Sequence, residues 1–154
     1  MGVAGLRRLQ VWSRAKDFAL KIYKQVLPLL PAEEKWALGQ QLRRASVSVP
    51  ANIAEGHGRF YYQDNVRFCY TARGSLEETL SHLVFAMEAG YIPQALFEQL
   101  EHEGEEIEKM LHGYISHLRR SKQGWNEPGL ARIVGEEPAS YSPPMIEDEI
   151  DNGP

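Results

Sequence analysis

The sequence predicts an all-α protein: an antiparallel up-down-up-down four-helix bundle followed by a flexible acidic C-terminal tail. Apolar residues recur at spacings of three and four through most of residues 9–118, the pattern of one face of an α-helix. No segment shows the strict alternation that is typical of a β-strand. The links between the apolar faces are short, and short links make successive helices antiparallel. We therefore expect residues 1–122 to form the bundle and residues 123–154 the tail.

The size and composition indicate one globular core in a reducing compartment. The chain has 154 residues, of which 43% are hydrophobic and 25% charged, as in ordinary globular domains. No apolar run reaches the roughly 18 residues of a membrane-spanning helix, and Met1–Arg8 lacks the pattern of a signal peptide. Cys69 is the single cysteine and cannot form an internal disulfide. We expect a cytoplasmic protein without membrane contact.

The first two helices are predicted from their apolar faces and from the prolines between them. The first helix ends near Pro28, and the second begins after Pro31 with Glu33 and Glu34 in its first turn, where the helix dipole favours anions. The face of the first helix is Trp12, Ala15, Phe18, Ala19, Ile22 and Val26. The face of the second helix is Leu38, Leu42, Ala45, Val49 and Ile53.

Pro50 lies inside the second apolar face, where a proline leaves the carbonyl of Ser46 without its amide partner. The apolar spacing nevertheless stays in phase across the proline, which favours one kinked helix over two helices. We expect the hydroxyl of Ser46 or Ser48 to help satisfy the freed backbone. Gly56 and Gly58 are the expected C-caps of this helix.

The third and fourth helices follow the same logic. Asp64 is the expected N-cap of the third helix and Gly90 its end, while Pro93 suits the first position of the fourth. The third apolar face is Phe68, Cys69, Ala72, Leu76, Leu80, Leu83 and Met87. The fourth is Leu96, Phe97, Leu100, Gly104, Ile107, Leu111, Tyr114 and Leu118.

The formal net charge of −4 conceals an uneven distribution. Residues 1–122 hold 16 basic and 14 acidic side chains, whereas residues 123–154 hold 1 basic and 7 acidic. Within the bundle, residues 1–76 hold 12 basic and 5 acidic side chains, and residues 77–108 hold 9 acidic and none that is basic. Two interpretations stay open: helix faces that pair with one another, or a surface that binds a polyanion. The tail either solubilises the protein or docks on a basic groove of its own or of a partner.

The residues exclude several kinds of chemistry. Gly56-His57-Gly58 lacks the strand, the spacing and the Lys-Ser/Thr pair of a phosphate loop. None of the four histidines of the last two predicted helices has a carboxylate three residues before it, as a di-iron bundle requires. Cys69 lies on an apolar face, which favours a buried small residue over a nucleophile. We expect no enzyme, no cofactor and no metal.

Residues 41–59 read QLRRASVSVPANIAEGHGR and carry more polar detail than helix packing needs. Arginines interleaved with Phe60, Tyr61, Tyr62 and Tyr70 suit a nucleic-acid surface, and they also suit a subunit interface. The candidate nucleic-acid-binding residues are Arg43, Arg44, Arg59, Arg67 and Arg73, the last three being the better candidates for phosphate contacts. The candidate structural or interface residues are Pro50, Asn52, Glu55 and Gly56, with Asn52 and Glu55 expected to pair with Arg43, Arg44 or Arg73.

Three segments carry a resemblance: LQVWSRA, QLRRASVSVPANIAEGHGR and FCYTARGSLEETLSHLVFAMEAGYI. They resemble the bacterial four-helix-bundle proteins first noticed as open reading frames in intervening sequences of large-subunit ribosomal RNA genes. That family is in turn similar to Avd, the accessory variability protein of diversity-generating retroelements. The resemblance covers residues 9–120. It implies a ring-like homopentamer without known catalytic activity and, for the Avd branch, a basic pentamer that binds a reverse transcriptase and its template RNA.

Three functional hypotheses follow. The first is a non-enzymatic homo-oligomeric adaptor that binds structured RNA, or RNA and DNA, and a reverse transcriptase as an Avd-like accessory protein. The second is a protein-interaction scaffold whose arginine and aromatic face builds the oligomer and whose acidic tail recruits a partner. The third is an antitoxin or regulator of a mobile element.

Overall fold

The computed structural model describes residues 2–121, and every regular element in that range is a helix. The α-helices are α1 (Val3–Arg7), α2 (Gln10–Lys21), α3 (Leu38–His57), α4 (Tyr62–Glu88) and α5 (Gln94–Ser121). The described part of the chain contains no strand, which confirms the all-α prediction. The predicted acidic tail at residues 123–154 lies outside the described residues.

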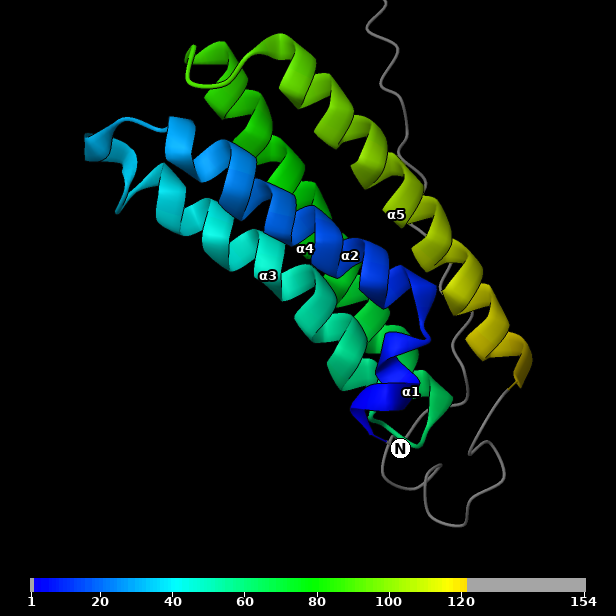
Figure 1. Cartoon of the computed structure of the whole chain (residues 1–154). Coiled ribbons are helices and arrows are strands. Elements are labelled where there is room, and N and C mark those ends of the chain that lie inside the picture. The colour runs from blue at the N-terminus through cyan, green and yellow to red at the C-terminus, as the bar shows by residue number, and fades with distance from the viewer. Residues whose placement is uncertain (1, 122–154) are drawn as a thin grey trace, which may run out of the picture.

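The four long helices lie side by side as an antiparallel bundle around one core (Figure 1). Each long helix contacts the next along the chain, and α5 contacts α2 to close the bundle. A π-helical turn at Ile22–Val26 and a 3₁₀ turn at Leu27–Leu29 extend α2 toward the next link. The largest fully buried side chains come from all four long helices and from the π-helical turn: Phe18, Ile22, Val26, Leu42, Val49, Ile53, Leu76, Thr79, Leu83, Leu100, Ile107 and Leu111. All of these residues except Thr79 are predicted apolar positions.

The second predicted helix begins later than expected, at Leu38 instead of just after Pro31. Residues Ala32–Glu34 form a separate 3₁₀ turn, and Ala37 leaves helical geometry with φ −112° and ψ −100°. The carboxylate of Glu34 accepts hydrogen bonds from the Leu38 backbone N–H at 3.2 Å and from the Tyr91 hydroxyl at 3.3 Å. Glu34 therefore caps α3 from the preceding turn and ties that turn to the α4–α5 link.

The starts of α4 and α5 also differ slightly from the prediction. Asp64 is not the N-cap, because α4 begins at Tyr62 after an extended Tyr61, and Asp64 lies in the first turn. Pro93 precedes α5, and its carbonyl accepts the first hydrogen bonds, from the N–H groups of Leu96 and Phe97. Both shifts keep the expected chemistry, since an acidic first turn and a proline at a helix start suit the backbone there.

The predicted end of α4 at Gly90 is confirmed. Gly90 has φ +80°, the left-handed conformation that glycine adopts most readily. Its N–H donates to the carbonyl of Met87 at 2.9 Å, and the N–H of Tyr91 donates to that of Ala86 at 2.9 Å. This pair of bonds satisfies the last carbonyls of the helix and turns the chain toward α5.

α3 continues through Pro50, as the in-phase apolar face predicts. The expected role of the serines is wrong. The Ser46 hydroxyl donates to the carbonyl of Arg43 at 3.3 Å, and the Ser48 hydroxyl lies 3.0 Å from the Ser75 hydroxyl of α4. Pro50 is buried, so the bundle holds α3 together by packing instead of by a serine bond to the freed carbonyl.

Gly56 is a packing residue and not a C-cap. It is buried in the last turn of α3, which ends at His57 with Gly58 at the cap in a right-handed conformation. A Cβ atom added to Gly56 would lie 2.7 Å from Oδ1 of Asn65 and 2.8 Å from Cβ of Phe68. The missing side chain therefore lets α3 approach α4 closely at this point.

We expect Gly56→Ala to destabilise the protein by about 1–3 kcal/mol, because the new methyl group would force α3 and α4 apart. Urea unfolding followed by circular dichroism measures this loss. Gly113→Ala is the matched control, since a Cβ there meets no atom within 4 Å, and the better helix propensity of alanine should stabilise α5 by up to about 1 kcal/mol. Equal stabilities of the Gly56→Ala variant and the native protein would contradict this role.

We expect the Cys69 thiol to resist modification in the folded protein. Cys69 is fully buried, and this burial raises the pKa of its thiol to about 11. The thiolate is the reactive form, so the group is protonated and inaccessible at pH 8. The disulfide reagent DTNB should react only after unfolding in urea, whereas a Ser116→Cys variant with an exposed thiol should react at once. Rapid reaction of native Cys69 would show that the core opens there.

Candidate nucleic-acid interface

Cations on the flanks of the bundle pair with carboxylates of the neighbouring helix. Arg14 of α2 pairs with Glu106 of α5, and Lys21 pairs with Glu103 of α5. Arg73 of α4 lies 3.0 Å from Glu108 of α5, and Arg44 of α3 lies 3.5 Å from Glu78 of α4. The structure thus supports the pairing interpretation of the uneven charge for these four cations, which their partners largely neutralise.

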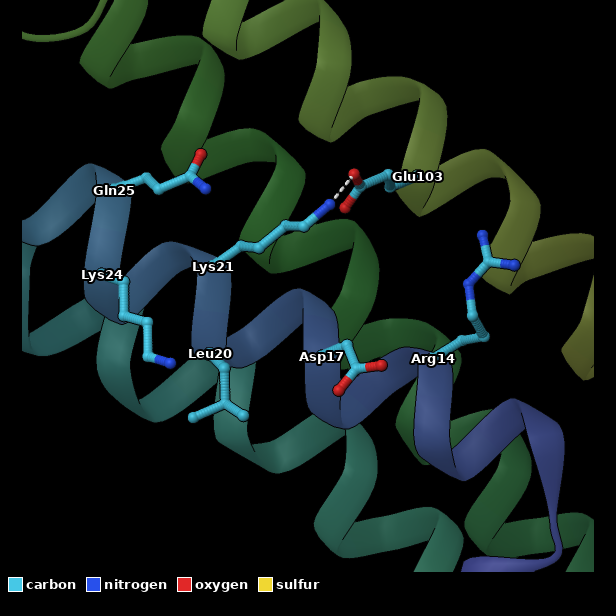
Figure 2. Close-up of a pocket in the computed structure, with 7 residues that line it drawn as sticks. All are labelled: Arg14, Asp17, Leu20, Lys21, Lys24, Gln25 and Glu103. Atoms are coloured by element: carbon cyan, nitrogen blue, oxygen red, sulfur yellow. Dashed lines mark hydrogen bonds and ion pairs between the residues drawn. The ribbon is translucent and has the colours of Figure 1, made fainter.

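A groove of about 460 Å³ between α2 and α5 illustrates this neutralisation (Figure 2). The ammonium of Lys21 points across the groove to the Glu103 carboxylate, and Asp17 adds a second carboxylate to the lining. Nearby, the hydrogen bond from Arg14 lowers the pKa of Glu106 and keeps its carboxylate ionised. Because charges of both signs line this groove, and Arg14 and Lys21 are paired with carboxylates, the groove is poorly suited to select an anion.

Arg43 and Arg44 are engaged in contacts within the protomer. The guanidinium of Arg43 donates to the carbonyl of Lys35 at 3.1 Å, and that of Arg44 donates to the Gln41 side chain at 3.0 Å. Arg43 and Arg59 are both on or just after α3 and are separated by about 24 Å along its axis. The five candidate arginines therefore do not form one cluster.

The expected pairing of Asn52 and Glu55 with Arg43, Arg44 or Arg73 is wrong. The Asn52 amide donates to the carbonyl of Ser48 at 2.8 Å and to its hydroxyl at 2.9 Å. Glu55 lies 3.1 Å from Arg59, one helical turn away. Both residues therefore make local contacts on α3, because side chains four residues apart lie next to each other on a helix.

Figure 1 shows α1, the α3–α4 link and the end of α5 at one end of the bundle, and six further exposed arginines belong to these segments and to the start of α4. We call this surface the basic end and define it by six residues: Arg7, Arg8, Arg59, Arg67, Arg119 and Arg120. A Cβ on Gly5 would lie 3.7 Å from Nε2 of His57, which places α1 against the end of α3. Arg119 of α5 donates to the Tyr70 hydroxyl of α4 at 2.7 Å, which joins these two helices. Within residues 2–16, 55–70 and 112–121, which form this end, the only carboxylates are those of Glu55 and Asp64.

Several guanidinium groups of the basic end are free to meet a ligand. Arg67 is exposed and has no side-chain partner within residues 2–121, and the same holds for Arg7, Arg8 and Arg120. Arg59 and Arg119 are the exceptions: Arg59 pairs with Glu55 and lies 5.2 Å over the Phe68 ring, and Arg119 donates to the Tyr70 hydroxyl. A free, exposed guanidinium can bind phosphate without first breaking an internal ion pair.

Aromatic rings accompany the arginines. Phe60 is 49% exposed and meets Tyr61 edge to face, with ring centroids 5.2 Å apart. Tyr70 is 43% exposed, and the Arg119 guanidinium lies 5.8 Å from its ring centroid. Exposed rings beside guanidinium groups can stack on unpaired bases while the cations contact phosphates.

Sequence reasoning missed four arginines of the basic end, namely Arg7, Arg8, Arg119 and Arg120. They occur as two adjacent pairs just outside the apolar faces, at the start and the end of the bundle. An antiparallel four-helix bundle brings the start of its first helix and the end of its last to the same end. Combining these pairs with the predicted topology would have placed them beside Arg59 and Arg67.

The part of the chain that the structure describes contains no group of three or more His, Cys, Asp or Glu side chains arranged to hold a metal ion. Across residues 2–121, no helix combines the length and the apolar character needed to cross a membrane.

Comparisons with known proteins agree with this fold. A solved structure similar to this chain is that of a protein of unknown function from the S23 ribosomal protein family of Bacteroides thetaiotaomicron VPI-5482. The two share 24% sequence identity and a TM-score of 0.63, over 68% of this chain and 97% of the other. At this identity the similarity shows the fold alone. None of the curated proteins matches the chain.

The family comparison is more specific. The model of the 23S rRNA-intervening sequence protein family matches residues 7–113, which include α2, α3, α4 and most of α5. The match covers the central segment with Pro50 and Gly56 and confirms the resemblance to this family. The chain belongs to the family of 23S rRNA-intervening sequence proteins.

Proposed function

We propose that the protein is a non-enzymatic, homo-oligomeric adaptor that binds structured RNA through the basic end. The observation that carries this proposal is that six exposed arginines lie at one end of the bundle, on or next to α1, in the α3–α4 link, at the start of α4 and at the end of α5. Within residues 2–121, most of these guanidinium groups have no carboxylate partner, in contrast to those on the flanks. The family's name, which refers to 23S rRNA, supports RNA as the polyanion.

The kind of RNA follows from the chemistry of the surface. Arginines without carboxylate partners supply affinity that does not depend on sequence, through phosphate contacts. Phe60 and Tyr70 supply exposed rings, and rings bind bases only where these are unpaired. A structured RNA with single-stranded loops satisfies both requirements better than a continuous duplex.

The oligomer is part of the proposal, and the pentameric number rests on the resemblance to the family. The flank shared by α3 and α4 offers a surface for a second copy, between the ion pairs Arg44–Glu78 and Glu55–Arg59. This uncharged flank consists of Val47, Ser48, Ala51, Asn52, Thr71, Gly74 and Ser75. Small uncharged residues let two helices approach closely without burying a charge.

The resemblance to Avd makes a reverse transcriptase the expected protein partner of this adaptor. The uncharged flank also favours a second candidate function, a protein-interaction scaffold. In that case the RNA contacts would be absent and the oligomer itself would be the functional product. Direct measurement of RNA binding distinguishes the two candidates.

We expect the triple variant Arg8→Ala, Arg67→Ala and Arg120→Ala to bind a fluorescein-labelled RNA hairpin at least about tenfold more weakly. The slope of log affinity against log salt concentration should become less negative by about 2, since roughly three phosphate contacts are lost. Fluorescence anisotropy across a salt series measures both quantities. Unchanged affinity and slope in this variant would overturn the proposed site.

The matched control removes the same number of positive charges elsewhere. Arg43→Ala, Arg44→Ala and Arg73→Ala delete guanidinium groups that are engaged within the protomer. The affinity for RNA should change by no more than about threefold, because the basic end keeps all six of its arginines. A loss as large as that of the basic-end variant would instead favour these three sequence-predicted residues as the phosphate contacts.

We expect light scattering of the native protein to give five times the protomer mass of 17.5 kDa. Ala51→Glu should lower this mass, because it would bury a carboxylate in the centre of the uncharged flank. Ala95→Glu, an exposed position in the first turn of α5, is the control and should leave the mass unchanged. A monomeric native protein would refute the oligomer, and an unchanged mass in Ala51→Glu would exclude this flank as the interface.

A further inference from the structure

The opposite end of the bundle carries a groove of about 390 Å³ between the start of α3 and the end of α4. We call it the aromatic groove; its lining is Glu34, Ala37, Leu38, Gln41, His82 and Phe85. Phe85 is 58% exposed, and the neighbouring turn carries Trp36, which is 74% exposed. Two large aromatic side chains left in water at one end of a small domain are typical of an interaction site.

The walls of the groove are held in place by hydrogen bonds. Glu34 accepts from Leu38 on the α3 side and from Tyr91 in the α4–α5 link, so it joins the two sides of this end. The guanidinium of Arg44 reaches Glu78, which further ties α3 to α4 just beyond the groove. A groove fixed in this way needs little reorganisation when a ligand enters, which favours binding.

The charges around the groove specify its occupant. On α4, Glu88 lies about one turn after Phe85 and is exposed, whereas Glu78, two turns before Phe85, is already paired with Arg44. Glu33 adds an exposed carboxylate from the turn before α3. A partner that buries an apolar side chain against Phe85 must therefore bring positive charge toward Glu88 and Glu33.

We propose that the aromatic groove binds a basic amphipathic helix of a partner protein. One apolar side chain of that helix packs against Phe85 and Ala37, and its lysines or arginines pair with Glu88 and Glu33. An amphipathic helix in a groove presents apolar residues at spacings of three and four with cations between them, which matches this pattern. Arg67 and Phe85 lie eighteen residues apart on α4, about 27 Å, so RNA and protein bind at separate ends. The proposal therefore stands or falls independently of the RNA site.

The test uses the full chain and a fluorescently labelled synthetic helix made of Leu and Lys, with the Leu stripe of an amphipathic helix. Phe85→Ser should weaken binding at least about tenfold, because it removes the central apolar contact. Leu20→Ser is the matched control, since Leu20 is a 44% exposed apolar residue on another helix; binding should change by less than about twofold.

Charge is tested separately, so the proposal does not depend on the folding of one variant. Glu88→Gln should weaken binding about two- to threefold, whereas Glu105→Gln on the exposed face of α5 should not. A peptide of Leu and Glu with the same stripe should not bind. Phe85→Ser should keep its affinity for the RNA hairpin.

Three results would overturn the proposal. One is equal binding of the Leu and Lys peptide to Phe85→Ser and Leu20→Ser. Another is equal binding of the Leu and Glu peptide to the native protein. The third is a fall in the light-scattering mass of Phe85→Ser, which would show that a second copy of this chain occupies the groove.

Discussion

The close approach of α3 and α4 at Gly56 is the contact on which the basic end depends. With no side chain at Gly56, Asn65 of α4 packs directly against the backbone of α3. Asn65 is 5% exposed, and its amide donates to the Tyr114 hydroxyl of α5 at 3.0 Å. Helices α3, α4 and α5 are thus joined at the level of Asn65. These contacts fix the positions of Arg59, Arg67 and the end of α5 relative to one another. A buried amide with satisfied partners specifies such a register better than apolar packing alone.

The packing of the helices also determines which charges are paired and which are left for a partner. Residues 77–108 carry only acidic charges, and much of that acidity is used on the flanks, where Glu78, Glu103, Glu106 and Glu108 pair with cations of neighbouring helices. These pairs are at least partly exposed and contribute little to stability. Their larger effect is electrostatic, because they leave the flanks near neutrality. The arginines of one end and the carboxylates near Phe85 at the other are then the charges that a partner meets.

Much of the fold could be predicted from the sequence, because apolar spacing reports directly on the buried face of a helix. Leu38 to Ile53 shows this well, since the phase of the face correctly predicted a continuous helix through Pro50. The start of that helix could not be predicted in this way. It depends on Glu34, whose carboxylate is positioned by Tyr91 from a distant part of the chain. The surroundings of Arg73 could not be predicted for a related reason: Arg73 looked available from its helical spacing, but Glu108 on another helix pairs with it.

The near balance of charge in residues 1–122, 16 basic against 14 acidic, does not argue against a polyanion partner. Charges act over the Debye length, which is about 8 Å at physiological ionic strength. Arg67 and Phe85 are separated by about 27 Å along α4, so the carboxylates near Phe85 are screened from a ligand at the basic end. An RNA phosphate close to Arg67 therefore responds to the local excess of arginine and not to the sum over the bundle. By the same reasoning, a cationic helix at Phe85 is not repelled by the arginines, and one small bundle can hold partners of opposite charge.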